Sequence, residues 1–213
     1  MKTMTPPTIS RNIHRLIERV VPGATGEFLD VRPEPGAVVN ECFPNVEAKV
    51  RNAGGRMLCG WQIWEWPHVL IEAEFHAVWV SSHGELVDIT PKQHEEARIL
   101  FVPNPKLAYS GLVRDNVRMA VRDDQLVHDF ISVAEAIVRV MNRGDRADQY
   151  GTVSVPSAEI DPLAAAKSFL GHSIGTGLRD HDPCLCGSGG KYKRCHAHHV
   201  AALLTRHSEA IAT

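Results

Sequence analysis

The feature that most constrains this sequence is a cluster of cysteine and histidine residues close to its C-terminal end. Residues 184–196 have the spacing C-x-C-x8-C-H. Three thiolates and one imidazole form a tetrahedral zinc set with no open position, the arrangement typical of structural sites. The glycines of the segment permit a tight loop, and Lys191, Lys193 and Arg194 offset the surplus negative charge of three thiolates. We therefore predict a zinc knuckle, too small to bury a core, whose folding energy comes from metal binding.

The run Cys-Gly-Ser-Gly-Gly-Lys-Tyr-Lys-Arg-Cys-His within residues 180–199 closely resembles the SEC-C zinc motif. The resemblance implies four metal ligands, Cys184, Cys186, Cys195 and His196. His198 and His199 are weaker candidates for the fourth position, and with only three thiolates an iron–sulfur site is less favoured than zinc. The resemblance also implies docking to a protein or ribosomal partner. Nucleic-acid binding through the Lys191–Arg194 patch is a weaker alternative, because so few basic groups neutralise little phosphate charge.

Composition narrows the class of protein. A chain of 213 residues with 44% hydrophobic and 23% charged residues is typical of a globular protein. A net charge of −2 argues against a whole-surface nucleic-acid or membrane binder. We expect a cytoplasmic protein with no membrane span, because no apolar run approaches about 20 residues and the N-terminal residues lack the pattern of a secretory signal. In that compartment the five cysteines are not a disulfide framework.

Periodicity predicts both strands and helices, and therefore an α+β fold with an antiparallel sheet. Apolar residues alternate from Leu70 to Val80 as in a strand, whereas those from Asp124 to Met141 follow helical spacing. The other predicted elements are a helix over 8–21 capped by Ser10, strands over 61–66 and 85–90, a helix that opens at Asp161-Pro162, and a linker over 171–182.

A second group of chemically active residues precedes these helices. Pro44 suits a first helical turn, so Cys42 is predicted at a helix N-terminus. A helix N-terminus and a nearby imidazole both favour the thiolate over the thiol. An imidazole base needs an acceptor that fixes its tautomer, and His76 and Asp88 suit these two roles. Taken singly, each of the three is as well explained as a buried or strand-end residue.

The spacing of His76 and Asp88 gives a structural test. If Ser81–His83 form a three-residue hairpin loop, His76 lies directly opposite Asp88 on one face of the sheet, whereas a loop of even length separates them. Glu72 and Glu74 share that face and predict a cleft that selects cationic or polar groups.

The order Cys42, then His76-Ala77-Val78-Trp79, then Asp88-Ile89-Thr90-Pro91 resembles the transglutaminase-like branch of the papain-like superfamily over residues 38–92. The resemblance implies Cys42 as nucleophile, His76 as general base and Asp88 as the orienting acid. It also implies thiol-dependent acyl transfer or hydrolysis of amides or esters. The sequence departs from the family in Val78 and in having no clear oxyanion-hole residue, for which Asn40 and the backbone amide of Cys42 are candidates.

We therefore expect a papain-like, transglutaminase-like core over 1–104, a helical extension over 105–171 and the zinc module over 180–213. Cys59 is predicted to pack in the core. Whether the protein is an enzyme stays open at this stage. The alternative function is that of a non-catalytic, zinc-containing adaptor.

Overall fold

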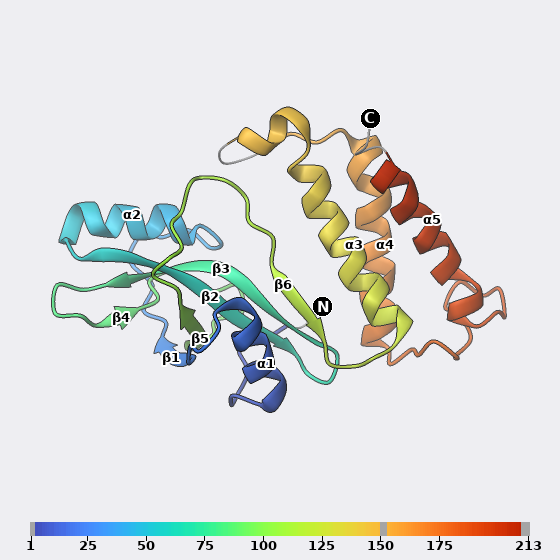
Figure 1. Ribbon diagram of the computed structural model, residues 1–213, viewed down its shortest axis with the longest axis horizontal. Helices are drawn as coiled ribbons and strands as arrows, with labels where there is room; N and C mark the ends of the chain where they lie inside the picture. Colours follow the sequence, from blue (N-terminus) through green and yellow to red (C-terminus); the bar gives the residue numbers. More distant parts are fainter. Residues whose placement is uncertain (1–2, 150–152, 210–213) are drawn as a thin grey trace.

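The chain folds into a twisted antiparallel sheet beside a layer of helices, which confirms the predicted α+β class (Figure 1). This computed structural model describes residues 3–149 and 153–209. The three predicted segments also include residues 1–2, 150–152 and 210–213, which lie outside the described residues. None of the described helices combines the length and the apolar character that crossing a membrane requires.

The described strands are ordered β1-β5-β2-β3-β4 across the sheet, and β6 also pairs with β3. Every pair of neighbouring strands is antiparallel. The strands are β1 (Glu27–Asp30), β2 (Arg56–Trp66), β3 (Leu70–Val80), β4 (Leu86–Val87), β5 (Arg98–Pro103) and β6 (Val117–Ala120). The helices are α1 (Arg11–Val20), α2 (Cys42–Ala53), α3 (Gln125–Met141), α4 (Ser157–Gly175) and α5 (His196–Glu209), with short 3-10 turns at Gly144–Asp148 and Tyr192–Arg194.

Three helices begin where the sequence predicts. The Ser10 hydroxyl accepts a hydrogen bond from the Ile13 amide (3.3 Å) and caps α1. The Asp124 carboxylate caps α3 in the same way, by accepting from the Val127 amide (3.0 Å). Helix α2 begins at Cys42. Side-chain caps satisfy amides that a helix leaves without partners, which explains why the starts of α1 and α3 are readable in the sequence. Helix α2 has no side-chain cap, and its start is indicated instead by Pro44 in the first turn.

The start predicted for α4 was wrong. The helix begins at Ser157, and Pro162 lies inside it instead of opening it. A proline inside a helix removes one main-chain hydrogen bond, and its ring crowds the carbonyl four residues earlier. Burial of Leu163 and Leu170 acts against that cost. The helix also continues to Gly175, so residues 171–175 are not part of a linker. In the segment predicted as a helical extension, β6 adds a strand to the sheet.

Strands β2 and β3 pair along their whole length, from Arg56 opposite Val80 to Trp66 opposite Leu70. Because side chains alternate along a strand, this register sorts them onto two faces. One face carries Ala73, Phe75 and Ala77, which pack with residues of α1 and α2. The other face carries His76 and Gln62. His76 pairs with Gly60, and Gln62 lies two positions after Gly60 in β2.

The outer edge of β3 is covered only at its two ends. Strand β4 pairs with Trp79 and Val80, and β6 pairs with residues 70–73. Among the described strands, none pairs with residues 74–78 on this side. His76 therefore lies where the sheet edge is open.

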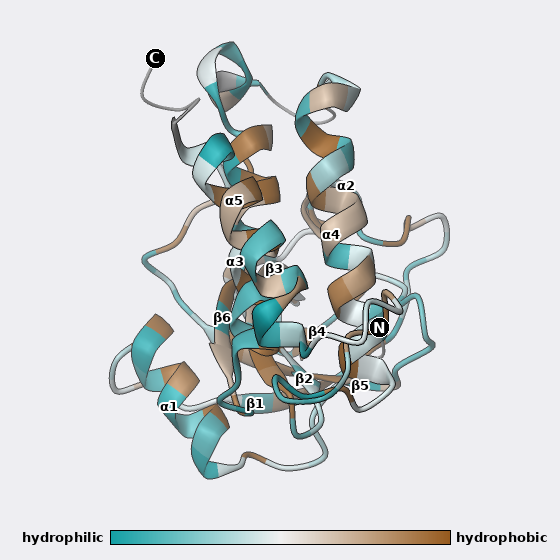
Figure 2. Cartoon of the chain, turned by 90° about the vertical axis from the view of Figure 1, so that its right-hand side faces the viewer, coloured by the Kyte–Doolittle hydropathy of each residue, from teal (hydrophilic) through white to brown (hydrophobic). Residues whose placement is uncertain are grey.

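Helices α3, α4 and α5 form the second layer (Figure 1). They carry apolar and polar residues on the same helix, as expected of amphipathic helices (Figure 2). Their buried residues form one core with Val69 and Leu70, so this layer packs against the β2–β3 end of the sheet.

Candidate functional site

A cavity of about 220 Å³ at the open edge of β3 contains the predicted nucleophile and base. Cys42 and His76 both line it, together with Gln62 and Lys92. Cys42 comes from the first turn of α2, whereas His76 comes from β3 and Gln62 from the neighbouring strand β2. Helix and sheet are thus needed together to build this site.

His76 and Asp88 are in direct contact. His76 Nε2 lies 3.0 Å from Asp88 Oδ2, and both side chains are almost fully buried. Gly60, opposite His76, leaves room for the Phe101 ring, which an added Cβ would approach to 2.5 Å. That ring packs edge-on against His76 at 6.5 Å between centroids.

The predicted parity of the hairpin is correct, but its register is shifted by two residues. Val80 pairs with Leu86, so Asp88 is not directly opposite His76. After Val87 the chain leaves β3, and Asp88 forms a parallel bridge with Val31. An even shift preserves the face of each side chain, and the long imidazole and the carboxylate meet diagonally.

Sequence reasoning missed Lys92, which completes the group. Its ammonium lies 2.5 Å from Asp88 Oδ2, 3.4 Å from His76 Nε2 and 3.1 Å from Gln62 Oε1. The side chain is only 7% exposed. The one available signal was the i,i+4 spacing of Asp88 and Lys92, but Pro91 places Lys92 in an irregular segment where a solvent-exposed lysine is the ordinary expectation.

The charges of this group control its protonation. Burial lowers the pKa of His76, but the Asp88 carboxylate and the Cys42 thiolate outweigh that effect and raise the pKa to about 9. Burial raises the pKa of Asp88, yet His76 and Lys92 bring it down to about 2. At neutral pH His76 is therefore an imidazolium and Asp88 a carboxylate.

Cys42 is 7% exposed and begins its helix after an unusual backbone turn. Asn40 has a φ of 64°, in the left-handed region that asparagine adopts more readily than most residues. This turn brings Asn40 to the cavity wall, where it was predicted as an oxyanion donor. Within the described chain no hydrogen bond joins Cys42 Sγ to His76; such bonds often tighten only when substrate binds.

Of the remaining predicted residues, Glu72 and Glu74 lie in the cavity wall and Cys59 lies in the core. Glu72 and Glu74 line the cavity, but Arg118 Nε neutralises Glu72 at 3.1 Å, and Glu74 accepts a hydrogen bond from Trp64 at 2.5 Å. Cys59 is buried in the core beneath α1, as predicted. Arg118 thus compensates part of the negative charge of the cavity wall.

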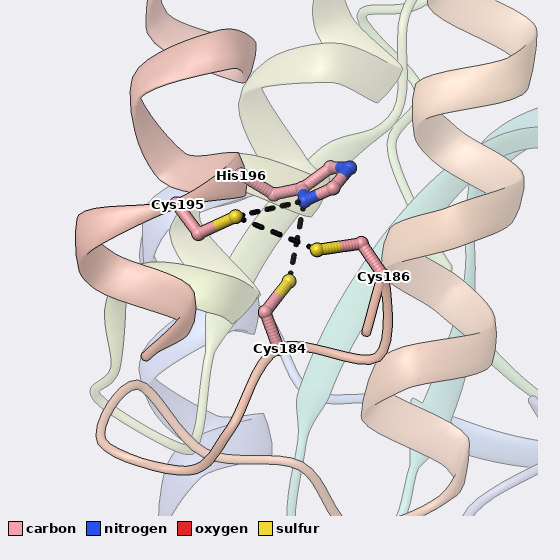
Figure 3. A group of neighbouring side chains, drawn as sticks. All are labelled: Cys184, Cys186, Cys195 and His196. Atoms are coloured by element: carbon pink, nitrogen blue, oxygen red, sulfur yellow. Dashed lines mark hydrogen bonds between the residues drawn. The ribbon is translucent and has the colours of Figure 1, made fainter. Parts of the chain in front are cut away.

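The second site brings Cys184, Cys186, Cys195 and His196 together (Figure 3). Their donor atoms all lie within 4.8 Å of one another. The Cys184 Sγ to His196 Nδ1 distance is 3.2 Å, and Cys186 and Cys195 Sγ are 3.5 Å apart. Tetrahedral zinc, with bonds of about 2.0–2.3 Å, places its donors about 3.5–3.8 Å apart. The residues therefore fit a four-coordinate metal ion.

A tight loop holds these ligands. The Cys184 amide donates to the Gly190 carbonyl (2.8 Å), and Gly187 has a φ of 79° that side chains rarely adopt. The Ser188 hydroxyl lies 3.2 Å from Cys186 Sγ and lowers the pKa of that thiol to about 7, which favours the thiolate that binds metal. The His196 ring stacks on Phe169 with 4.3 Å between centroids.

Residues 180–196, which we call the metal segment, share a hydrophobic core with α3 and α4. The prediction that this segment is too small to bury a core is therefore wrong. Tyr192 is fully buried among residues of α3 and α4, and its hydroxyl donates to Asp129 at 2.5 Å. The Asp180 carboxylate accepts hydrogen bonds from the Gln125 and Leu126 amides (2.9 and 3.0 Å) at the start of α3. A metal ion held by these ligands would therefore stabilise the same unit as the helix packing does.

Comparisons with known proteins support the metal segment alone. Residues 182–197 match the model of the SEC-C motif. No curated protein and no solved structure matches the chain.

We expect the purified protein to contain one metal ion per chain and to unfold at lower temperature once the ion is removed. Loss of the metal frees Cys184 and Cys195, which pack in the helical core. Each kcal/mol lost lowers the Tm of a chain this size by about 2–4 °C. Elemental analysis and thermal unfolding monitored by circular dichroism measure both effects. His196→Ala should lose the metal and His199→Ala should keep it; a metal-free chain with unchanged Tm would contradict this.

We also expect Asp88→Asn to lower the pKa of His76 well below its value of about 9 in the native chain. The substitution removes the carboxylate that raises this pKa, whereas burial and Lys92, which lower it, remain. Titration of the imidazole by NMR measures the shift. Asp30→Asn, which changes an exposed carboxylate on β1, is the control and should leave the His76 titration in place. An unchanged pKa in Asp88→Asn would show that the contact does not govern the protonation of His76.

Proposed function

We propose that the protein is a cysteine-dependent acyltransferase or hydrolase that acts on amides or esters. The observation that carries the proposal is that Cys42, at a helix N-terminus, lines one cavity with His76, whose ring is held by Asp88 at 3.0 Å. The order of a cysteine helix followed by a histidine strand and an aspartate also supports a transglutaminase-like main domain. A buried base with a fixed acceptor is the arrangement that thiol catalysis needs.

The charge state of the site suggests how the groups would act. Cys42 attacks the substrate carbonyl as its thiolate and forms a carbon–sulfur bond, while His76 holds a proton as the imidazolium. The carbon–nitrogen or carbon–oxygen bond of the leaving group then breaks, and that group takes the proton from His76. Neutral His76 next removes a proton from water or an amine, which attacks the thioester and releases Cys42. Water gives hydrolysis, and an amine gives transamidation.

We expect an activated aryl ester to acylate Cys42 at neutral pH, and His76→Ala to slow this reaction by about 100- to 10,000-fold. Mass spectrometry of the modified peptide measures the rate at each cysteine. Cys59→Ala is the matched control and should keep the acylation rate, since Cys59 is buried in the core. A Cys42 no more reactive than Cys59 would contradict the enzyme and favour the non-catalytic adaptor.

We further propose that the metal is zinc and that the metal segment docks a protein partner. Three thiolates and an imidazole are a zinc set without an open position, which suits a structural role. Lys191 and Arg194 are exposed beside the ligands and give this surface a positive charge. A partner with an acidic surface fits it better than nucleic acid does, because so few cations neutralise few phosphates.

Reversing these charges separates docking from folding. We expect Lys191→Glu with Arg194→Glu to lose the partner in co-purification while keeping the metal content and Tm, because both side chains are exposed. Arg11→Glu with Arg15→Glu, which reverses two exposed charges on α1, should keep the partner. Equal losses in the two double variants would contradict docking through the metal segment.

A further inference from the structure

One buried polar group in the cavity has no partner. Gln62 is 1% exposed, and its Nε2 makes no hydrogen bond to any described residue. A buried carboxamide N–H without a partner costs about 1–3 kcal/mol, so such groups are rare unless they have a use. The other end of the same carboxamide is occupied, since Gln62 Oε1 accepts from Lys92 at 3.1 Å. Lys92 therefore fixes which end of the amide remains free to donate.

Gln62 is a neighbour of His76 in the sheet. Gln62 pairs with Glu74 across the strands, and Gly60 pairs with His76, so Gln62 and His76 are diagonal neighbours on one face. Gln62, His76 and Cys42 line the same cavity. Lys92 contacts both Gln62 and Asp88, so one ammonium orients the amide and the carboxylate of the site together.

We infer that Gln62 Nε2 donates the hydrogen bond that stabilises the oxyanion during acyl transfer at Cys42. This inference rests on the proposed function. When Cys42 Sγ bonds to the carbonyl carbon, the carbonyl π pair moves onto oxygen, and Gln62 Nε2 donates a hydrogen bond to that oxygen. As the intermediate collapses, the pair re-forms the carbonyl and the leaving group departs with the proton from His76. A donor already held in place requires no reorganisation during the reaction.

Sequence reasoning had no signal for this role. Gln62 is one of three polar residues in β2, with Arg56 and Glu65, and it lies twenty positions after Cys42. The sequence candidates for the donor were Asn40 and the Cys42 amide. Asn40 lines the cavity as well, so Gln62 acts beside these donors.

Two reagents for Cys42 separate an oxyanion donor from a merely structural residue. An aryl ester reacts through a tetrahedral oxyanion, whereas iodoacetamide alkylates sulfur by displacement and forms none. We expect Gln62→Met, uncharged and similar in size, to slow acylation of Cys42 by about 100- to 1,000-fold while alkylation keeps its native rate. Gln62→Leu serves if the methionine variant does not fold. Gln93→Met, at an exposed glutamine of the same cavity, is the matched control and should change neither rate.

The outcomes are distinct. Equal slowing of both reactions would overturn the inference, because it would show that Gln62 only supports the fold or the thiolate. Native acylation in Gln62→Met would overturn it as well, because the oxyanion would then be stabilised elsewhere. Failure of the proposed function has its own signature: in the native protein the ester would modify Cys42 no faster than Cys59.

Discussion

The site depends on the continuous register between β2 and β3. Eleven residues of each strand pair without a bulge, so every side chain of this hairpin has a fixed face. The apolar face binds α1 and α2 and thereby places Cys42; the opposite face presents Gln62 and His76. A slip of one residue would exchange the two faces and bury the imidazole under the helices. The hydrophobic pattern that selects this register therefore also assembles the cavity.

At the cavity, the sequence could predict only those features that depend on residues close together in the chain. The start of α2 at Cys42, the strand that carries His76 and the odd length of the hairpin all follow from short-range signals. The position of Asp88 required more, because its bridge to Val31 draws it away from β3. Lys92 and Gln62 come together only through tertiary packing across residues 62–92, and no periodicity indicates such a contact.

For the metal segment, the sequence indicated the ligands but not their surroundings. Its ligands lie within a stretch so short that spacing alone indicates the coordination set. Its environment was not readable, because the contacts that hold it are distant in sequence: Tyr192 reaches Asp129 across 63 positions. The motif can thus be recognised from a short stretch of sequence, but its structure depends on contacts with α3. The papain-like resemblance of the main domain stays a prediction, supported by the geometry of its three residues and by no matching structure.

The cap that Asp180 provides has a consequence for the order of folding during synthesis. The amides at the start of α3 bind a carboxylate made 55 residues later, whereas the two strands of the central hairpin follow each other directly. On a ribosome that adds residues one at a time, the sheet can therefore form while α3 still lacks this partner. The core of the helical layer includes residues of the metal segment, which are synthesised last. A shortage of metal during translation would therefore affect the helical layer before the sheet.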